Sequence, residues 1–326
     1  AGPSTARSSN HSSRNTWGSK MTTDQPIPTM PADFDDYWAA VLSELLATPA
    51  RPEVELIPIR CTDFADMYGV RLTSIGPYRL YAYLSIPKGD GPFPAIYWSP
   101  KYASVLETIP QGTANFVRSR YVTFSCAGRG QRNADQPFAA MFPGLLTTGI
   151  ESPETYIFRG IVADAIRGLE YVASRPEVDT SKVVTIGNDV ALIAGALGKG
   201  ATQLVVTPAL FFDTLRLASQ TSGYPLEEMN DYLRHSPLNR GDAQRTVGYF
   251  NPRWFAPKFD GSTLVMAQHT GGLLDATGLA PVIEGLGGST TVHESQDSSY
   301  LDGLILERWI TAQFGFDEAI VPEHWQ

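Results

Sequence analysis

The order of hydrophobic and polar positions in the N-terminal third predicts one amphipathic helix followed by three strands. Across residues 31–46, apolar side chains recur at helical spacing, and acidic residues lie in the first turn, where the helix dipole favours negative charge. Strands are expected at residues 54–60, 68–75 and 80–86. Their short connections predict antiparallel pairing.

The rest of the chain alternates apolar runs with helix-length segments. Residues 94–98 and 121–125 are continuous apolar runs, which are typical of parallel strands buried on both faces. Long helices are expected at residues 156–174 and 301–314, and short strands at 183–186, 204–207, 264–268 and 290–293. Such alternation predicts an α/β fold, with a mostly parallel central sheet that follows antiparallel N-terminal strands.

One helix-rich segment, about residues 213–257, interrupts this alternation. We expect it to form a helical cap over the carboxyl ends of the strands. Residues 21–326 are therefore interpreted as a single domain with a helical insertion. Residues 1–20 contain no acidic side chain and are rich in Ser, Arg and Asn, so we expect a disordered, appended remnant ahead of the domain.

Charge and cysteine content narrow the expected partners. The chain has 25 Lys and Arg against 34 Asp and Glu, a net charge of −9, which argues against nucleic acid or an anionic membrane as partner. No apolar run approaches the roughly 20 residues of a membrane span. Cys61 and Cys126 lie in strand-like contexts and are interpreted as free thiols in a reducing, cytoplasmic setting. No nucleotide-binding or metal-ligand motif occurs, so no cofactor or metal is expected.

The segment from Val183 to Leu197 carries the most informative pattern. It is expected to run from a buried strand through a glycine turn into a helix of small residues, which is the context of the nucleophile elbow G-x-S-x-G of α/β-hydrolases. Here the elbow is Gly187-Asn188-Asp189-Val190-Ala191. Asp189 therefore stands where the nucleophilic serine is expected.

Several further segments together resemble the acetyl xylan esterase and cephalosporin-C deacetylase family, over about residues 31–316. They are 33–38, Arg129-Gly130-Gln131, 142–150, Tyr156, Arg159, 164–167, 176–179 and 249–251. The resemblance implies an α/β-hydrolase fold, a homo-oligomer assembled as a hexamer, and a small-molecule substrate. In that family a serine attacks an acetyl carbonyl, a histidine acts as base and an aspartate orients the histidine.

Residue by residue, the resemblance places Asp189 at the serine position and Val190 at the following glutamine. Asp275 takes the position of the orienting acid, although an ungapped alignment would place Gly272 there. Two residues compete for the base position: Asp297 after the last strand, or His293 four residues earlier.

The resemblance also implies roles for residues around the elbow. Tyr102 matches a tyrosine whose backbone N–H contributes to the oxyanion hole. Arg129 is expected to brace loops near the site, together with Gln131 of the same motif. Substrate-pocket candidates, with a surface or packing role as the alternative for several of them, are Tyr102, Lys101, Val190, His269, His293 and Phe212.

Three functional hypotheses follow from the altered elbow. Asp189 and Asp297, placed within hydrogen-bond reach, would share a proton and support non-hydrolytic acid/base chemistry of a lyase, dehydratase or cyclase type, with specialised biosynthesis as the hypothesised setting. Alternatively, Asp189 is the nucleophile of an ester hydrolase, which also needs a histidine to cleave the intermediate. In the third hypothesis the chain is a catalytically inactive pseudoenzyme, and Asp189 only caps the elbow helix.

Overall fold

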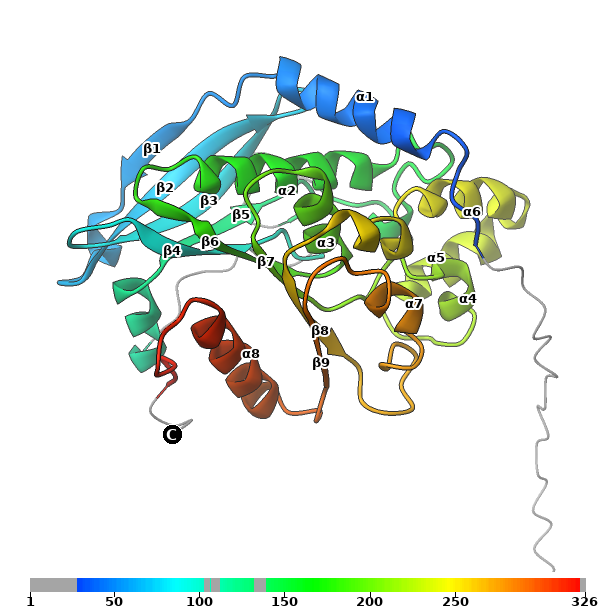
Figure 1. The fold of residues 1–326 in the computed structure, drawn as a ribbon. Helices are drawn as coiled ribbons and strands as arrows, with labels where there is room; N and C mark the ends of the chain where they lie inside the picture. The colour runs from blue at the N-terminus through cyan, green and yellow to red at the C-terminus, as the bar shows by residue number, and fades with distance from the viewer. Residues whose placement is uncertain (1–27, 103–105, 107–111, 132–138, 323–326) are drawn as a thin grey trace, which may run out of the picture.

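The computed structural model describes residues 28–102, 106, 112–131 and 139–322, so the expectation for residues 1–20 lies outside the described part of the chain. The described residues form one nine-stranded sheet in the order β1-β2-β3-β5-β4-β6-β7-β8-β9 (Figure 1). The strands are β1 (Glu53–Leu56), β2 (Ala65–Ser74), β3 (Tyr78–Pro87), β4 (Phe93–Trp98), β5 (Val122–Ala127), β6 (Val178–Gly187), β7 (Gln203–Val206), β8 (Ser262–Ala267) and β9 (Thr290–Glu294).

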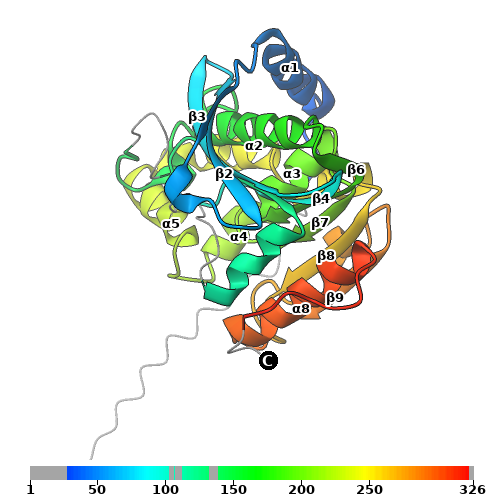
Figure 2. The ribbon, with the colours of Figure 1, turned by 90° about the vertical axis from the view of Figure 1, so that its left-hand side faces the viewer.

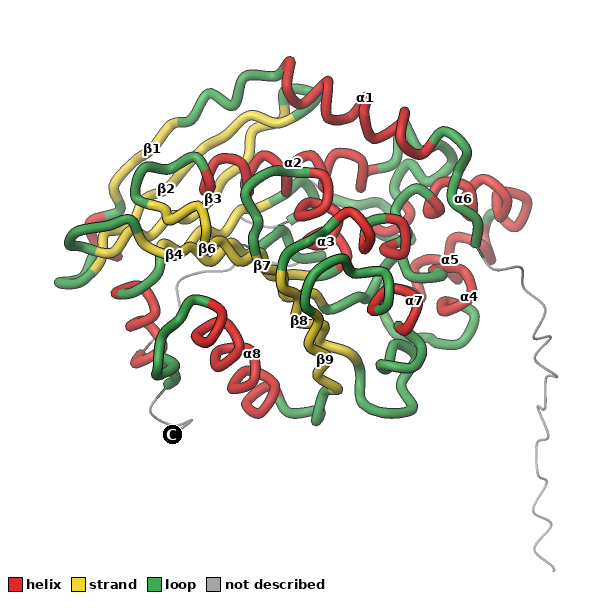
Figure 3. Tube along the Cα trace, in the orientation of Figure 1, coloured by secondary structure: helices red, strands yellow, loops and turns green. Residues whose placement is uncertain are grey.

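The described α-helices comprise α1 (Phe34–Ala47), α2 (Ile157–Ala173), α3 (Asp189–Leu197), α4 (Thr214–Ala218), α5 (Leu226–His235), α6 (Arg240–Gly248), α7 (Ala280–Ile283) and α8 (Ser299–Gln313). Short 3-10 helices occur at η1 (Pro58–Arg60), η2 (Gly112–Ser119), η3 (Leu145–Thr147), η4 (Pro237–Asn239), η5 (Pro252–Trp254) and η6 (Ala256–Lys258). Figure 3 shows how helices and loops are distributed around the sheet.

Strand directions confirm the predicted fold class. β1, β2 and β3 pair antiparallel, and β3 also pairs antiparallel with β5. From β5 through β4 and β6 to β9, neighbouring strands run parallel. The carboxyl ends of these parallel strands therefore lie along one edge, where the loops that follow them can converge.

Two predicted strand boundaries differ from the structure by four or more residues. The strand expected at 54–60 ends at Leu56, and Pro58 opens a 3-10 turn because proline has no N–H for the sheet ladder. β6 begins at Val178, five residues before the predicted start, since Val178 pairs with Phe93 ahead of a register shift. The intervening residues are polar, so hydrophobicity did not mark that stretch.

Helices cover the two faces of the sheet unequally (Figures 1 and 2). α2 and α3 pack on one face with α1 outside α2, whereas α8 lies on the opposite face. The larger core joins α1, α2 and α3 to the segment between β7 and β8. A smaller core beneath α8 is formed by strand residues such as Ile96 and Val205 together with Ile310 and Phe314.

The helix-rich segment predicted at 213–257 contains α4, α5, α6 and η5. Helix α1 anchors it through Trp38, whose indole N–H donates to the carbonyl oxygen of Tyr249 at 3.0 Å. The same indole ring packs edge-on against Phe250 and Phe255. Because Trp38 is fully buried, this contact joins the N-terminal helix and the insertion in one core.

In the described part of the chain, no helix is both long and apolar enough to cross a lipid bilayer.

We predict that Trp38→Phe lowers the free energy of unfolding by about 1–3 kcal/mol, because the buried carbonyl of Tyr249 loses its donor. Denaturant unfolding followed by circular dichroism measures the change. Leu238→Ala, at an exposed position of the same insertion, is the control and should change stability by less than about 0.5 kcal/mol. Equal stability of wild type and Trp38→Phe would show that the indole bond contributes nothing.

Candidate functional site

The turn between β6 and α3 differs from a nucleophile elbow in its backbone. A nucleophile elbow holds its central residue in a strained turn that exposes the side chain. Asn188 has an extended backbone, with φ −90° and ψ −156°, and its side chain accepts a hydrogen bond from the N–H of Val190 at 3.0 Å. Within the described residues, positive φ at non-glycine positions occurs only at Arg51, Asp213 and Asp297. Asp189, the central residue of the expected elbow, is not among them, so the turn at 187–189 lacks a strained, left-handed residue.

Asn188 is also the N-cap of α3, which corrects part of the pseudoenzyme hypothesis. That hypothesis assigned the cap to Asp189, but Asp189 is the first residue inside the helix. Its negative charge still lies in the first turn, where the helix dipole stabilises it.

The carboxylate of Asp189 points into the protein and holds the loop after β7. One oxygen, Oδ2, accepts hydrogen bonds from the N–H groups of Ala209 and Leu210, both at 2.8 Å. The other oxygen, Oδ1, accepts a longer bond of 3.5 Å from the N–H of Phe211. The side chain is fully buried, and burial raises its pKa, although the three amide bonds favour the ionised form.

Little space remains beside the turn. The cavity at the carboxyl ends of β4, β5 and β6 has a volume of about 10 Å³. Such a volume holds about one water molecule. Its lining includes Lys101, Tyr102, Arg129, Asn188 and Val190. Four of these residues were expected around the site, namely Lys101, Tyr102, Arg129 and Val190. They do lie together, but the space between them is nearly filled.

The other expected catalytic carboxylates have different partners. Asp275 accepts hydrogen bonds from the backbone N–H groups of Gly278 at 2.8 Å and Gly271 at 2.9 Å, and these bonds lower its pKa. Asp297 lies 3.2 Å from Nδ1 of His269. Both members of that pair are exposed, with side-chain accessibilities of 72% for Asp297 and 56% for His269.

His293, the alternative base, pairs with Asp302 of α8 rather than with Asp275. Its Nε2 lies 2.7 Å from Oδ1 of Asp302, which also accepts a hydrogen bond from the N–H of Gln296, while Oδ2 accepts one from the Ser295 hydroxyl. Burial opposes the ionised form of Asp302, but these bonds outweigh it and lower its pKa. In the part of the chain that the structure describes, no two of the four expected catalytic residues contact each other or share a hydrogen-bond partner. They are Asp189, Asp275, Asp297 and His293. The shared-proton pair expected between Asp189 and Asp297 is not formed.

Arg129 and Gln131 brace the turn after β5. The guanidinium of Arg129 forms two bonds with the buried carboxylate of Asp164, at 2.9 and 2.8 Å, and donates to the carbonyl of Ile75. The side chain of Gln131 accepts from the N–H of Gly128. Each side chain therefore contacts and holds neighbouring loops.

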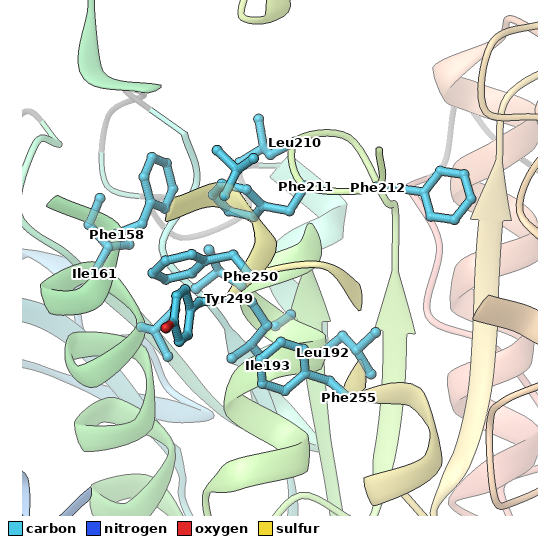
Figure 4. Close-up of a cluster of buried hydrophobic side chains, with 14 of the residues drawn as sticks. Phe158, Ile161, Leu192, Ile193, Leu210, Phe211, Phe212, Tyr249, Phe250 and Phe255 are labelled. Carbon is cyan, nitrogen blue, oxygen red and sulfur yellow. The ribbon is translucent and has the colours of Figure 1, made fainter. Parts of the chain in front are cut away.

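Phe212 lies away from the turn between β6 and α3. Figure 4 shows Phe211 among Phe158 and Phe250, whereas Phe212 points in the opposite direction. The guanidinium of Arg253 lies over the ring of Phe212, 4.7 Å from its centroid. Consecutive aromatic residues of the loop thus enter two different environments.

Sequence reasoning missed Glu228, which α5 places beside Tyr102. The Tyr102 hydroxyl donates to Oε2 of Glu228 at 2.5 Å. The N–H of Leu146 donates to the Tyr102 hydroxyl oxygen and to Oε2 of Glu228, each at 2.9 Å. Glu228 is buried, and burial raises its pKa. Gly144 makes room for it, because a Cβ at that position would lie 2.1 Å from Cδ of Glu228. In the sequence, Glu227-Glu228 resembles the solvated face of a helix, so no local signal marks this contact.

Among the residues that the structure describes, no group of three or more His, Cys, Asp and Glu side chains is arranged to hold a metal ion.

We predict that Asp189→Ala lowers the free energy of unfolding by about 3–5 kcal/mol, since three buried N–H groups lose their acceptor. Chemical denaturation measures this difference. Asp90→Ala, at an exposed turn, serves as the matched control and should stay within about 0.5 kcal/mol of wild type. If Asp189→Ala is as stable as the control, the carboxylate does not hold the loop.

A second prediction concerns pH. Because the folded-state pKa of Glu228 is raised, its contribution to stability is present at low pH and is lost as pH rises above the ordinary glutamate range. The melting temperature of Glu228→Gln, minus that of wild type, should therefore increase between pH 4 and pH 8. Thermal unfolding across this range measures it.

Glu227→Gln is the matched control for this experiment. Hydrogen bonds from Asn230 and Arg234 lower the pKa of Glu227, so the same substitution should decrease the melting temperature relative to wild type as pH rises. If the melting-temperature differences of the two variants from wild type changed with pH in the same direction, burial would not be what raises the pKa of Glu228.

Comparisons with known proteins agree with this fold. Residues 19–278 match the family model described as acetyl xylan esterase (AXE1). The acetyl esterase Axe7A of Xylanibacter ruminicola is 24% identical over 216 residues, which cover 62% of this chain and 49% of that protein. The chain thus spans about half the length of this curated relative.

Two solved structures share the architecture. The acetyl xylan esterase from Paenibacillus sp. R4 superposes with a TM-score of 0.74 at 22% identity, covering 88% of this chain and 96% of that one. Acetyl xylan esterase 1 from Thermoanaerobacterium sp. JW/SL YS485 gives a TM-score of 0.75 at 18% identity, covering 89% and 96%. Both likenesses show the α/β-hydrolase fold. Since the family model matches most of the chain, this protein belongs to the acetyl xylan esterase (AXE1) family.

Proposed function

We propose that this family member does not hydrolyse esters at the turn between β6 and α3, and that it acts as a binding or assembly protein. The observation that carries the proposal is the orientation of Asp189. Its carboxylate is fully buried and accepts hydrogen bonds from Ala209, Leu210 and Phe211. A group in that position stabilises a loop and does not face a substrate.

The Asp-nucleophile alternative requires two features. The attacking oxygen must reach an electrophile, and a histidine must activate the water that cleaves the covalent ester. Both oxygens of Asp189 face the loop amides, and the neighbouring cavity of about 10 Å³ leaves no room for an acyl group. His269 and His293 are paired with Asp297 and Asp302 instead.

A second candidate function keeps non-hydrolytic acid/base catalysis but assigns it to other residues. Glu228 is a buried carboxyl group with a raised pKa, and the hydroxyl of Tyr102 lies 2.5 Å from it. Groups of this kind serve as general acids and bases. Tyr102 lines the small cavity beside Asn188, so a substrate would require the cap to open there.

Assays with p-nitrophenyl acetate test the main proposal. We expect no turnover above that of the Asp189→Asn variant, because the side chain at position 189 takes no part in acyl transfer. Release of p-nitrophenol is followed at neutral pH, with thermally unfolded protein as the blank.

Robust turnover by wild type that Asp189→Asn abolishes would establish the Asp-nucleophile hydrolase instead. Turnover that survives in Asp189→Asn but is lost in Glu228→Gln would show ester hydrolysis at Tyr102 and Glu228, and would overturn both the main proposal and the non-hydrolytic form of the second candidate. Absence of turnover in all three proteins agrees with the proposed loss of ester hydrolysis.

A further inference from the structure

A second cavity lies inside the insertion, between α4, α6 and η5. Its volume is about 140 Å³, and it shares no lining residue with the small cavity beside Asn188. Its wall includes Phe211, whose N–H is one of the three bonded by Asp189. We call this space the cap pocket.

Charged residues in the wall of the cap pocket are not balanced. The carboxylate of Asp213 accepts bonds from the guanidinium groups of Arg253 at 3.0 Å and Arg216 at 3.2 Å. One acidic and two basic side chains leave an excess of one positive charge. In a chain whose net charge is −9, such a local excess is suited to an anionic ligand.

Arg253 contributes a guanidinium group to the wall of the cap pocket. Its side chain is 15% exposed, and it contacts Asp213 through Nη2. Arg216, which also lines the pocket, is 41% exposed. Guanidinium groups present several N–H donors in one plane and bind carboxylates well.

Asp213 is also held in an unusual backbone conformation. Its φ is +48°, in the left-handed region, and its side chain is buried. Asn251 contributes a third, longer contact of 3.4 Å to the same carboxylate. Non-glycine residues in this region carry some strain and cluster at ligand sites. The surrounding contacts thus fix the carboxylate that orients both arginines.

The wall also has an apolar part, beside the polar residues Thr214, Gln244 and Asn251. Phe211, Leu215 and Val247 line the cap pocket, and all three are buried. A cavity of roughly 150 Å³ accommodates a molecule the size of benzene. The cap pocket has about this size, so an anion that fills it would carry a compact apolar body.

We propose that the cap pocket binds a small organic carboxylate with a ring-sized apolar body, its carboxylate group at Arg253 and Arg216. The ring would contact Phe211, Leu215 and Val247. This inference does not depend on whether the turn between β6 and α3 hydrolyses esters, because the two cavities have separate linings.

Isothermal titration of the full chain with three probes tests the proposal. Benzoate should bind, whereas benzamide, which has the same shape without the charge, should bind at least about tenfold more weakly. Acetate, which lacks the ring, should bind more weakly than benzoate as well. The proposal is overturned if benzoate does not bind at concentrations up to about 10 mM. It is also overturned if benzoate and benzamide bind equally well.

Arginine substitutions locate the binding site. Arg253→Gln should weaken benzoate binding by at least about tenfold, and Arg216→Gln by about threefold to tenfold, because each removes a positive charge from the wall. Arg216 is partly exposed, so its variant decides the question if Arg253→Gln does not fold.

The matched control is Arg245→Gln on α6. Arg245 pairs with Asp242 at the surface and is not part of the cap-pocket lining. The substitution changes the net charge by the same amount and should leave benzoate binding unchanged. Equal weakening by Arg245→Gln and Arg216→Gln would indicate a general charge effect and would overturn the assigned site.

Discussion

The hydrogen bonds from the loop after β7 to the Asp189 carboxylate are the constraint on which the candidate site and the start of the insertion depend. A buried carboxylate must be hydrogen-bonded, and here three consecutive backbone amides provide that pairing. The bonds link the first turn of α3 to the segment that leads into α4. Fold and candidate function depend on the same contact, because it withdraws the side chain from the sheet edge and fixes one wall of the cap pocket.

Most of the fold could be predicted from the sequence because buried strands and helices have characteristic patterns of apolar residues. Continuous apolar runs identified β4 and β5, and the spacing of apolar positions identified α1 and α2. The early part of β6 left no such trace, since its residues between Val178 and Val183 are polar and largely accessible. Pro58 ended β1 sooner than hydrophobicity suggested.

Less of the site could be predicted, and the reason is physical. Sequence position located the turn at 187–189, but the direction of the Asp189 side chain depends on a loop 20 residues later. Glu228 meets Tyr102 across 126 residues, and Asp213 meets Arg253 across 40. Contacts of this range arise from tertiary packing, so periodicity and local motifs carry no information about them. The family resemblance predicted which sequence positions lie near the site, but not which side chains or backbone groups they contact.

The unstrained turn at 187–189 has a consequence for redesign of this chain. A serine introduced at position 189 would leave three enclosed amides without their acceptor, and its hydroxyl would not be presented by a strained backbone. A single substitution would therefore cost stability without creating an exposed nucleophile, so any engineered esterase would also need a rebuilt loop after β7.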